Sequence, residues 1–185
     1  MLGRRILSTL FCVLAMSMNV RADDVDVFMA ELGLTNAPPR TGACLWTPPR
    51  QIDVEGGALQ LERCWTNRTD CFFALNATGG AVVANCRVGT ASTPLQAERR
   101  LCEILTFCIS MPISDFAHEF EALRVDSGDL VILDRHDVGE ACPGKTRYFR
   151  TRGNLFVTIK CNPGHARFSA REIASGLLSA GVAPL

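Results

Sequence analysis

The stretch CFFALNATGGAVV, residues 71–83, decides how this chain is expected to fold. Apolar and small residues alternate along its first half, and Gly79-Gly80 interrupts the pattern before a second apolar run. Alternation with a period of two places successive side chains on opposite faces of a strand, and a Gly-Gly pair is a common hairpin turn. The stretch therefore predicts two strands joined by a tight turn.

Short runs of the same kind recur along the chain, with Gly, Asn, Asp and Pro between them. In NLFVTIKC, residues 154–161, every second residue from Leu155 to Cys161 falls on one face. We expect further strands in GGALQLERC, GAVVANCRV, DLVILD and YFRTRG. Many short strands with turn signals between them predict an all-β fold, an antiparallel β-sandwich.

One segment differs from this pattern. TPLQAERRLCEILTFCI, residues 93–109, has good helix formers and charges in its first half, whereas its second half reads equally well as a strand. We interpret this segment as a helical or mixed insertion in the sandwich.

The first 22 residues predict a secretory signal peptide. Arg4 and Arg5 precede an uncharged apolar run over residues 6–18, and a small-residue cleavage site ends at Ala22. The run is too short and wrongly flanked for a transmembrane span. We therefore expect the mature protein to be secreted and extracellular.

The rest of the chain divides by composition. An acidic and then Pro-rich stretch, 23–43, predicts a short helix or loose arm followed by a linker, and 44–170 form the main domain. The uncharged tail, 171–185, is expected to be packed or frayed, or to be the tail of a lipid-anchor signal at the cell surface.

Charge narrows the choice of partners. Cleavage of the signal peptide removes three of the 19 basic residues and none of the 19 acidic ones, which leaves a net charge of about −3. No basic patch stands out, so nucleic acid is not an expected partner.

Eight of the nine cysteines belong to the expected mature chain. An even number in an exported protein predicts up to four disulfides, and the sequence alone leaves about 105 pairings open. The spacings lack repeated CxxC pairs and few histidines accompany them, which argues against a zinc site. The eight are Cys44, Cys64, Cys71, Cys86, Cys102, Cys108, Cys142 and Cys161.

Two sequons, at Asn67 and Asn76, predict N-glycosylation in an exported chain. Trp46 and Trp65 each lie next to or near a cysteine, so we expect both rings to pack against disulfides rather than to form a ligand platform. Of the neighbours Phe72 and Phe73, one is expected to face the core and the other to lie under the insertion or a glycan.

Several ordered matches over about residues 44–170 resemble the CUB domain. The spacing of Cys71, Phe73, Leu75, Ala77, Gly80 and Val83 is similar to the strand and Gly turn of that family. FAHEFE (116–121), DLVILD (129–134) and NLFVTIKCN (154–162) resemble its later strands, and Cys142-Pro143-Gly144 its Cys-Gly turn. The resemblance implies a CUB-like jelly roll with a first disulfide between Cys44 and Cys71.

The same resemblance implies a calcium site. Glu121 and Asp129, eight residues apart, match the two acidic ligands of the family, and Asn162 occupies the place of its last aspartate. Calcium prefers six to eight oxygen ligands, which carboxylate and amide groups supply. The competing interpretation is that these are solvated surface side chains.

The chain departs from the family pattern at the third cysteine position, where Asp126 stands, so Cys142 must find another partner or remain a thiol. The stretch of about 85–112 is also longer than the family pattern allows, so the resemblance implies a partly helical insertion there. The sequence contains no G-x-S-x-G, HExxH or phosphate-binding glycine loop. We therefore predict a non-enzymatic binding module that recognises an extracellular protein or glycan. The alternative is a secreted disulfide-rich enzyme inhibitor or enzyme that acts through residues 85–112.

Overall fold

The computed structural model describes residues 22–38, 46–107, 109, 111–125, 128–135, 141–142 and 147–180. Nearly all of the predicted signal peptide lies outside these residues, as do Cys44, Cys108 and the side chain of Cys142. None of the helices in the described ranges is long and apolar enough to cross a membrane.

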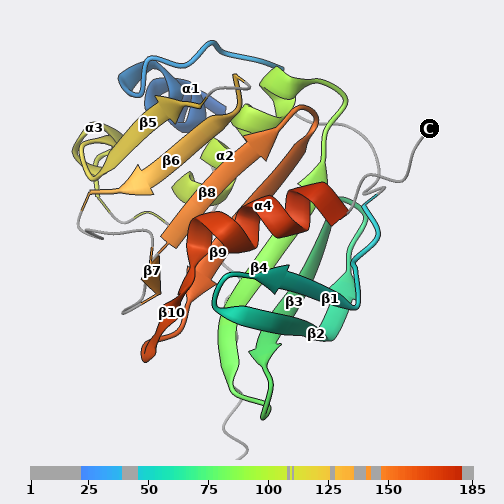
Figure 1. The fold of residues 1–185 in the computed structure, drawn as a ribbon. Coiled ribbons are helices and arrows are strands. Elements are labelled where there is room, and N and C mark those ends of the chain that lie inside the picture. Colours follow the sequence, from blue (N-terminus) through green and yellow to red (C-terminus); the bar gives the residue numbers. More distant parts are fainter. Residues whose placement is uncertain are drawn as a thin grey trace, which may run out of the picture.

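An eight-stranded antiparallel sheet forms the centre of the molecule, in the order β1-β2-β3-β4-β9-β8-β6-β5 (Figure 1). Two four-stranded meanders make up this sheet, and they join where β4 pairs with β9. The strands are β1 Gln51–Val54, β2 Gly57–Thr66, β3 Asp70–Ala77, β4 Val82–Thr90, β5 Phe120–Arg124, β6 Leu130–Asp134, β8 Arg147–Arg152 and β9 Leu155–Cys161. A separate two-stranded sheet pairs β7 Ala141–Cys142 with β10 His165–Ser169.

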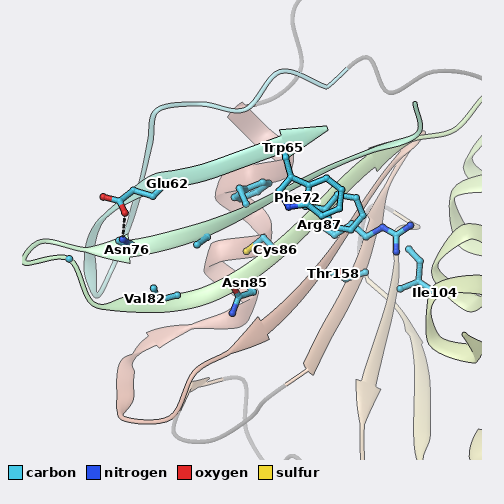
Figure 2. Close-up of a pocket in the computed structure, with 13 residues that line it drawn as sticks. Glu62, Trp65, Phe72, Asn76, Val82, Asn85, Cys86, Arg87, Ile104 and Thr158 are labelled. Carbon is cyan, nitrogen blue, oxygen red and sulfur yellow. Dashed lines mark hydrogen bonds between the residues drawn. The ribbon is translucent and has the colours of Figure 1, made fainter. Parts of the chain in front are cut away.

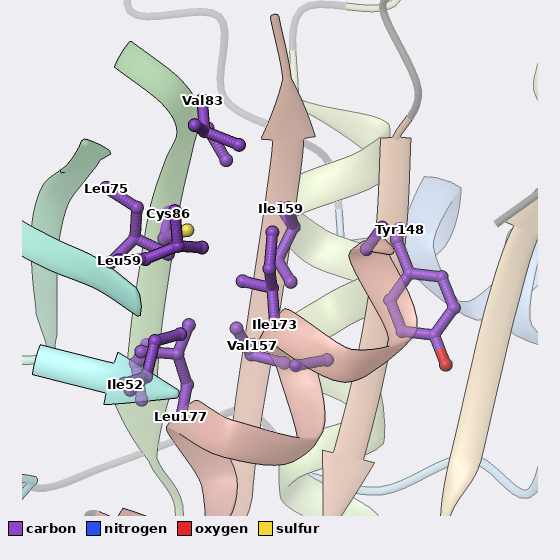
Figure 3. Packing of buried hydrophobic residues seen from close by; sticks show 14 of the residues in the cluster. Ile52, Leu59, Leu75, Val83, Cys86, Tyr148, Val157, Ile159, Ile173 and Leu177 are labelled. Carbon is purple, nitrogen blue, oxygen red and sulfur yellow. The ribbon is translucent and has the colours of Figure 1, made fainter. Parts of the chain in front are cut away.

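Helix α4, Ala170–Ala180, covers one face of the large sheet and packs against β1, β8 and β9. Its buried residues, which include Ile173 and Leu177, meet inward-facing side chains of both meanders, such as Leu75 and Ile159 (Figure 3). The Trp46 ring completes this core: it stacks on Phe73 and its Nε1 donates a hydrogen bond to the Leu177 carbonyl. Residues 171–180 of the C-terminal tail are therefore packed on the sheet, whereas the lipid-anchor interpretation stays a prediction.

Three helices cover the opposite face, but only over the second meander. They are α1 Ala22–Glu31, α2 Pro94–Thr106 and α3 Ile113–Ala117. Helix α2 packs on β8 and β9, and α1 packs on α2 and α3. The core between them contains Phe28, Leu101 and Phe156.

The predicted antiparallel β-rich fold is confirmed, and so is the helical interpretation of the segment that begins at Thr93. The Thr93 hydroxyl accepts a hydrogen bond from the Gln96 amide and caps α2 at its N-terminus. Residues 82–90, however, form a central strand of the sheet, so the region of about 85–112 is not an insertion into it. Helices supply the main layers that cover the sheet, and the finer CUB-like jelly roll stays a prediction.

Candidate binding site on the uncovered sheet face

The α2 side of β2, β3 and β4 has no helix packed over it among the described residues. Helix α2 reaches only the border of this surface, through Arg100 and Ile104. A cavity of about 690 Å³ lies here (Figure 2). Small Ala74 separates Phe72 from Asn76 on the same face of β3, which leaves space between the two larger side chains. We call this cavity the β2–β4 pocket.

A ladder of three side chains forms one end of the β2–β4 pocket. Trp65, Phe72 and Arg87 are cross-strand neighbours on β2, β3 and β4. The Trp65 and Phe72 rings stack with centroids 4.1 Å apart and an interplanar angle of 6°, and the Arg87 guanidinium lies 4.8 Å from the Phe72 centroid. Trp65 is nevertheless 59% exposed. Its ring is therefore part of an exposed surface, because its strand face has no covering layer among the described residues, and its packing against a disulfide stays a prediction.

A buried carboxylate fixes Arg87 in this ladder. Asp70 is fully buried, and its Oδ2 accepts hydrogen bonds from Arg87 Nε at 3.0 Å and from Arg100 Nη2 at 3.1 Å. Burial by itself would raise the pKa of Asp70, but the hydrogen bonds and charges of Arg87 and Arg100 outweigh it and hold that pKa below its usual value. Asp70 thus pairs with both guanidinium groups and, through Arg100, ties α2 to the border of the pocket.

The other end of the β2–β4 pocket is polar. Asn76 is only 4% exposed, and its Nδ2 donates a 2.7 Å hydrogen bond to Oε2 of the exposed Glu62 (Figure 2). Asn76 Oδ1 is buried without a hydrogen-bond partner among the described residues. Glu62 takes part in none of the ion pairs between described side chains, and its second carboxylate oxygen remains open to a ligand. A buried amide therefore positions an exposed carboxylate across from an aromatic wall.

The structure does not bring the three predicted calcium ligands together. Asp129 bonds to the Gly153 amide, just before β9, whereas Asn162 directly follows the last residue of that strand. The seven residues of β9 therefore separate Asp129 from Asn162 by roughly 20 Å. Two ligands of one calcium ion are at most about 5 Å apart. Glu121 lies on β5 opposite Leu133, further along the hairpin from Asp129. These residues do not fit one coordination site, and no cluster of three or more His, Cys, Asp or Glu in the described ranges could hold a metal ion.

The described cysteines fall into three groups. Cys86 and Cys102 are buried, and burial raises the pKa of both thiols, which makes them unreactive. Cys161 is held in a disulfide whose partner is not among the described side chains. The Sγ atoms of Cys64 and Cys71 lie 3.0 Å apart. The predicted pairing of Cys71 with Cys44 stays a prediction.

The two sequons differ in accessibility, which leads to a prediction. Asn67 is exposed, and its Oδ1 accepts three hydrogen bonds in a turn, from Thr69 N, Thr69 Oγ1 and Asp70 N, so its Nδ2 is available for a glycan. In contrast, Asn76 uses its Nδ2 to hold Glu62. We expect folded protein from eukaryotic cells to carry a glycan on Asn67 and none on Asn76. Glycopeptide mass spectrometry tests this, and a glycan on Asn76 in the folded fraction would contradict it.

One of the two neighbouring phenylalanines, Phe73, faces the core as expected, whereas Phe72 lines the uncovered pocket, and no described element covers it as the sequence predicted. It missed the site itself, because the covered and uncovered parts of one sheet face have the same alternating pattern. The usable signal is the polar character of Glu62, Asn76 and Asn85 on outward positions of neighbouring strands. No protein-family model, curated protein or solved structure matches the chain.

Proposed function

We propose that this chain is an extracellular binding module that recognises a protein partner by receiving one of its basic side chains in the β2–β4 pocket. The observation that carries this proposal is the pairing of two features across the cavity: the exposed Glu62 carboxylate, held by buried Asn76, and the exposed ring of Trp65. A lysine or arginine side chain has an apolar stem for the aromatic wall and a charged head for the carboxylate.

The charges around the pocket favour a cation. Of the charged residues that line it, Arg87 is already paired with Asp70, whereas Glu62 bonds only to a neutral amide among the described side chains. The unpartnered Oδ1 of Asn76 adds an unmet acceptor at the same end. A ligand with several N–H donors would therefore be complementary, and a second carboxylate would be repelled.

A protein partner is supported by the composition of the surface. Tryptophan and arginine dominate the energetic centres of protein interfaces, and here both stand on a rigid sheet rather than on a loop. Preorganised side chains lose little conformational entropy on binding. The CUB resemblance also implies recognition of a partner rather than catalysis, and the predicted export would place this surface outside the cell.

The test uses synthetic pentapeptides, acetylated and amidated at their ends, with lysine or norleucine at the centre. Binding is followed by NMR through the indole Nε1–H resonance of Trp65. We expect the lysine peptide to bind with a Kd of about 1 mM. Glu62→Gln is expected to weaken it about tenfold, 1.4 kcal/mol, because the charge-assisted hydrogen bond is lost.

The matched control is Glu121→Gln, the same change at an exposed strand residue on the far edge of the sheet. It is expected to leave the affinity unchanged. Equal binding of the norleucine peptide, or equal effects of the two glutamate variants, would contradict a site for a cation. A neutral oligosaccharide that shifts the Trp65 resonance when the lysine peptide does not would instead favour a glycan ligand.

A further inference from the structure

Cys64 and Cys71 directly precede Trp65 and Phe72, the two stacked rings at the aromatic end of the β2–β4 pocket. Their Sγ atoms are 3.0 Å apart, about 1 Å more than the length of a covalent S–S bond. Cys64 is exposed, on β2, whereas Cys71 is fully buried at the start of β3. One sulfur is therefore accessible to a reagent, and the second lies within reach of the first.

A β-bulge in β2 brings the two cysteines together. Between Glu62 and Trp65 the chain advances three residues while β3 advances two, from Ala74 to Phe72, and Cys64 lies within this irregularity. A bulge bends its strand and redirects the side chains beside it. Trp65, the residue after Cys64, is the outermost member of the aromatic ladder.

We propose that Cys64 and Cys71 form a reversible disulfide across β2 and β3, and that this bond fixes the bulge that presents Trp65 to the pocket. The bond itself follows from the position of the two thiols, whereas its effect on ligand binding rests on the proposed function. An oxidising compartment, as predicted from the leader sequence, favours the bonded form.

The oxidation proceeds by thiol–disulfide exchange with a low-molecular-weight disulfide such as oxidised glutathione. The Cys64 thiolate attacks one sulfur of that disulfide, forms a mixed disulfide and releases one glutathione thiolate. The Cys71 thiol then loses its proton, and its thiolate attacks the Cys64 sulfur and expels the second glutathione. Two protein thiols are oxidised, one glutathione disulfide is reduced to two thiols, and reduced glutathione reverses both steps.

The first experiment maps the bond in the mature full-length chain after equilibration in glutathione buffers of increasing oxidation. Remaining thiols are alkylated, and the protein is digested with trypsin and chymotrypsin, because trypsin alone leaves Cys71 and Cys86 in one peptide. We expect a Cys64–Cys71 cross-link that disappears under reduction, with Cys86 and Cys102 alkylated only after unfolding.

Closing this short loop should raise Tm by about 5 °C. Pairing of Cys71 with Cys44, or no cross-link to Cys64, would overturn the inference.

The second experiment compares the oxidised protein with the reduced protein and with Cys64→Ser. We expect the Trp65 indole resonance of the reduced protein and of Cys64→Ser to differ from that of the oxidised protein. Both should also bind the lysine pentapeptide about fivefold more weakly than the oxidised protein does. An unchanged Trp65 resonance would overturn the control of the ladder by the bond, whether or not the peptide binds. If the resonance moves but neither form binds the peptide, the disulfide and its effect on Trp65 stand and the proposed function fails.

Discussion

Replacement of Asp70 by asparagine is expected to lower the free energy of unfolding at pH 7 by about 3 kcal/mol. Asp70 is fully buried, and the side chains of Arg87 and Arg100, which it pairs with, are about one-fifth exposed (21% and 22%). Asparagine has nearly the shape of aspartate but carries no charge. The two largely buried guanidinium groups therefore lose their common anionic partner. Urea denaturation of both proteins measures the difference.

The same residue makes part of the stability depend on pH. Because the folded-state pKa of Asp70 lies below its unfolded value, the unfolded chain binds more protons in the window between the two. The stabilisation is therefore complete above about pH 4 and is lost as the pH falls below it. Asp70→Asn should lose less stability than the wild type over that range. Asp53→Asn, at an exposed position of β1, is the control, and an equal effect of the two substitutions would contradict a special role for Asp70.

Replacement of Gly89 by alanine is expected to cost a similar amount, about 3 kcal/mol, through overpacking. A Cβ atom at this position would lie 2.4 Å from the Phe156 ring and 2.5 Å from Oδ1 of Asp70. Both neighbours are fully buried, so neither can move without disturbing the packing under α2 or the ion pairs of Asp70. Thermal and urea unfolding measure the loss.

The matched control is Gly176→Ala in α4. A Cβ there would meet Ile52 at 3.5 Å or more, which is ordinary contact, and alanine favours a helix over glycine by about 1 kcal/mol. We expect this variant to be as stable as the wild type or more so. If Gly89→Ala unfolds at the same urea concentration as the wild type, the close approach of β4, Phe156 and Asp70 is wrong.

The strands were predictable because each has a local pattern. In β9 the face expected to be apolar, with Val157 and Ile159, does lie in the core under α4. The sequence did not reveal that Phe156, on the opposite face, is buried as well, because that depends on α2 packing over β9. Alternation identifies the faces of a strand, but the layer that covers each face is decided by distant parts of the chain.

Helix α2 also carried a local signal that could have fixed its start. Thr93-Pro94-Leu95-Gln96 combines a capping threonine, a proline in the first turn and a glutamine three residues after the cap. The preceding strand, β4, falls partly within the predicted insertion, because the family pattern allows a shorter stretch of chain at this point. In the structure β4 pairs with both β3 and β9 and joins the two meanders.

The functional site was the least predictable part. The family resemblance directed attention to Glu121, Asp129 and Asn162, which the sheet distributes over separate strands and strand ends. The β2–β4 pocket instead depends on a missing layer over one half of a sheet face, and on a bulge that a sequence pattern does not indicate. That bulge places Glu62 and Trp65, which are three residues apart on β2, on the same face and at opposite ends of one cavity.

Backbone-amide NMR, which maps the binding of the lysine pentapeptide onto the structure, tests the proposed pocket most directly. We expect chemical-shift changes confined to the exposed face of β2–β4, with the largest changes at Glu62, Trp65 and Ala74. Residues around Asp129 and the helix α4 should not respond. Shifts centred on Asp129 or α4, or shifts that the norleucine peptide reproduces, would contradict the claim that the uncovered sheet face binds a basic side chain.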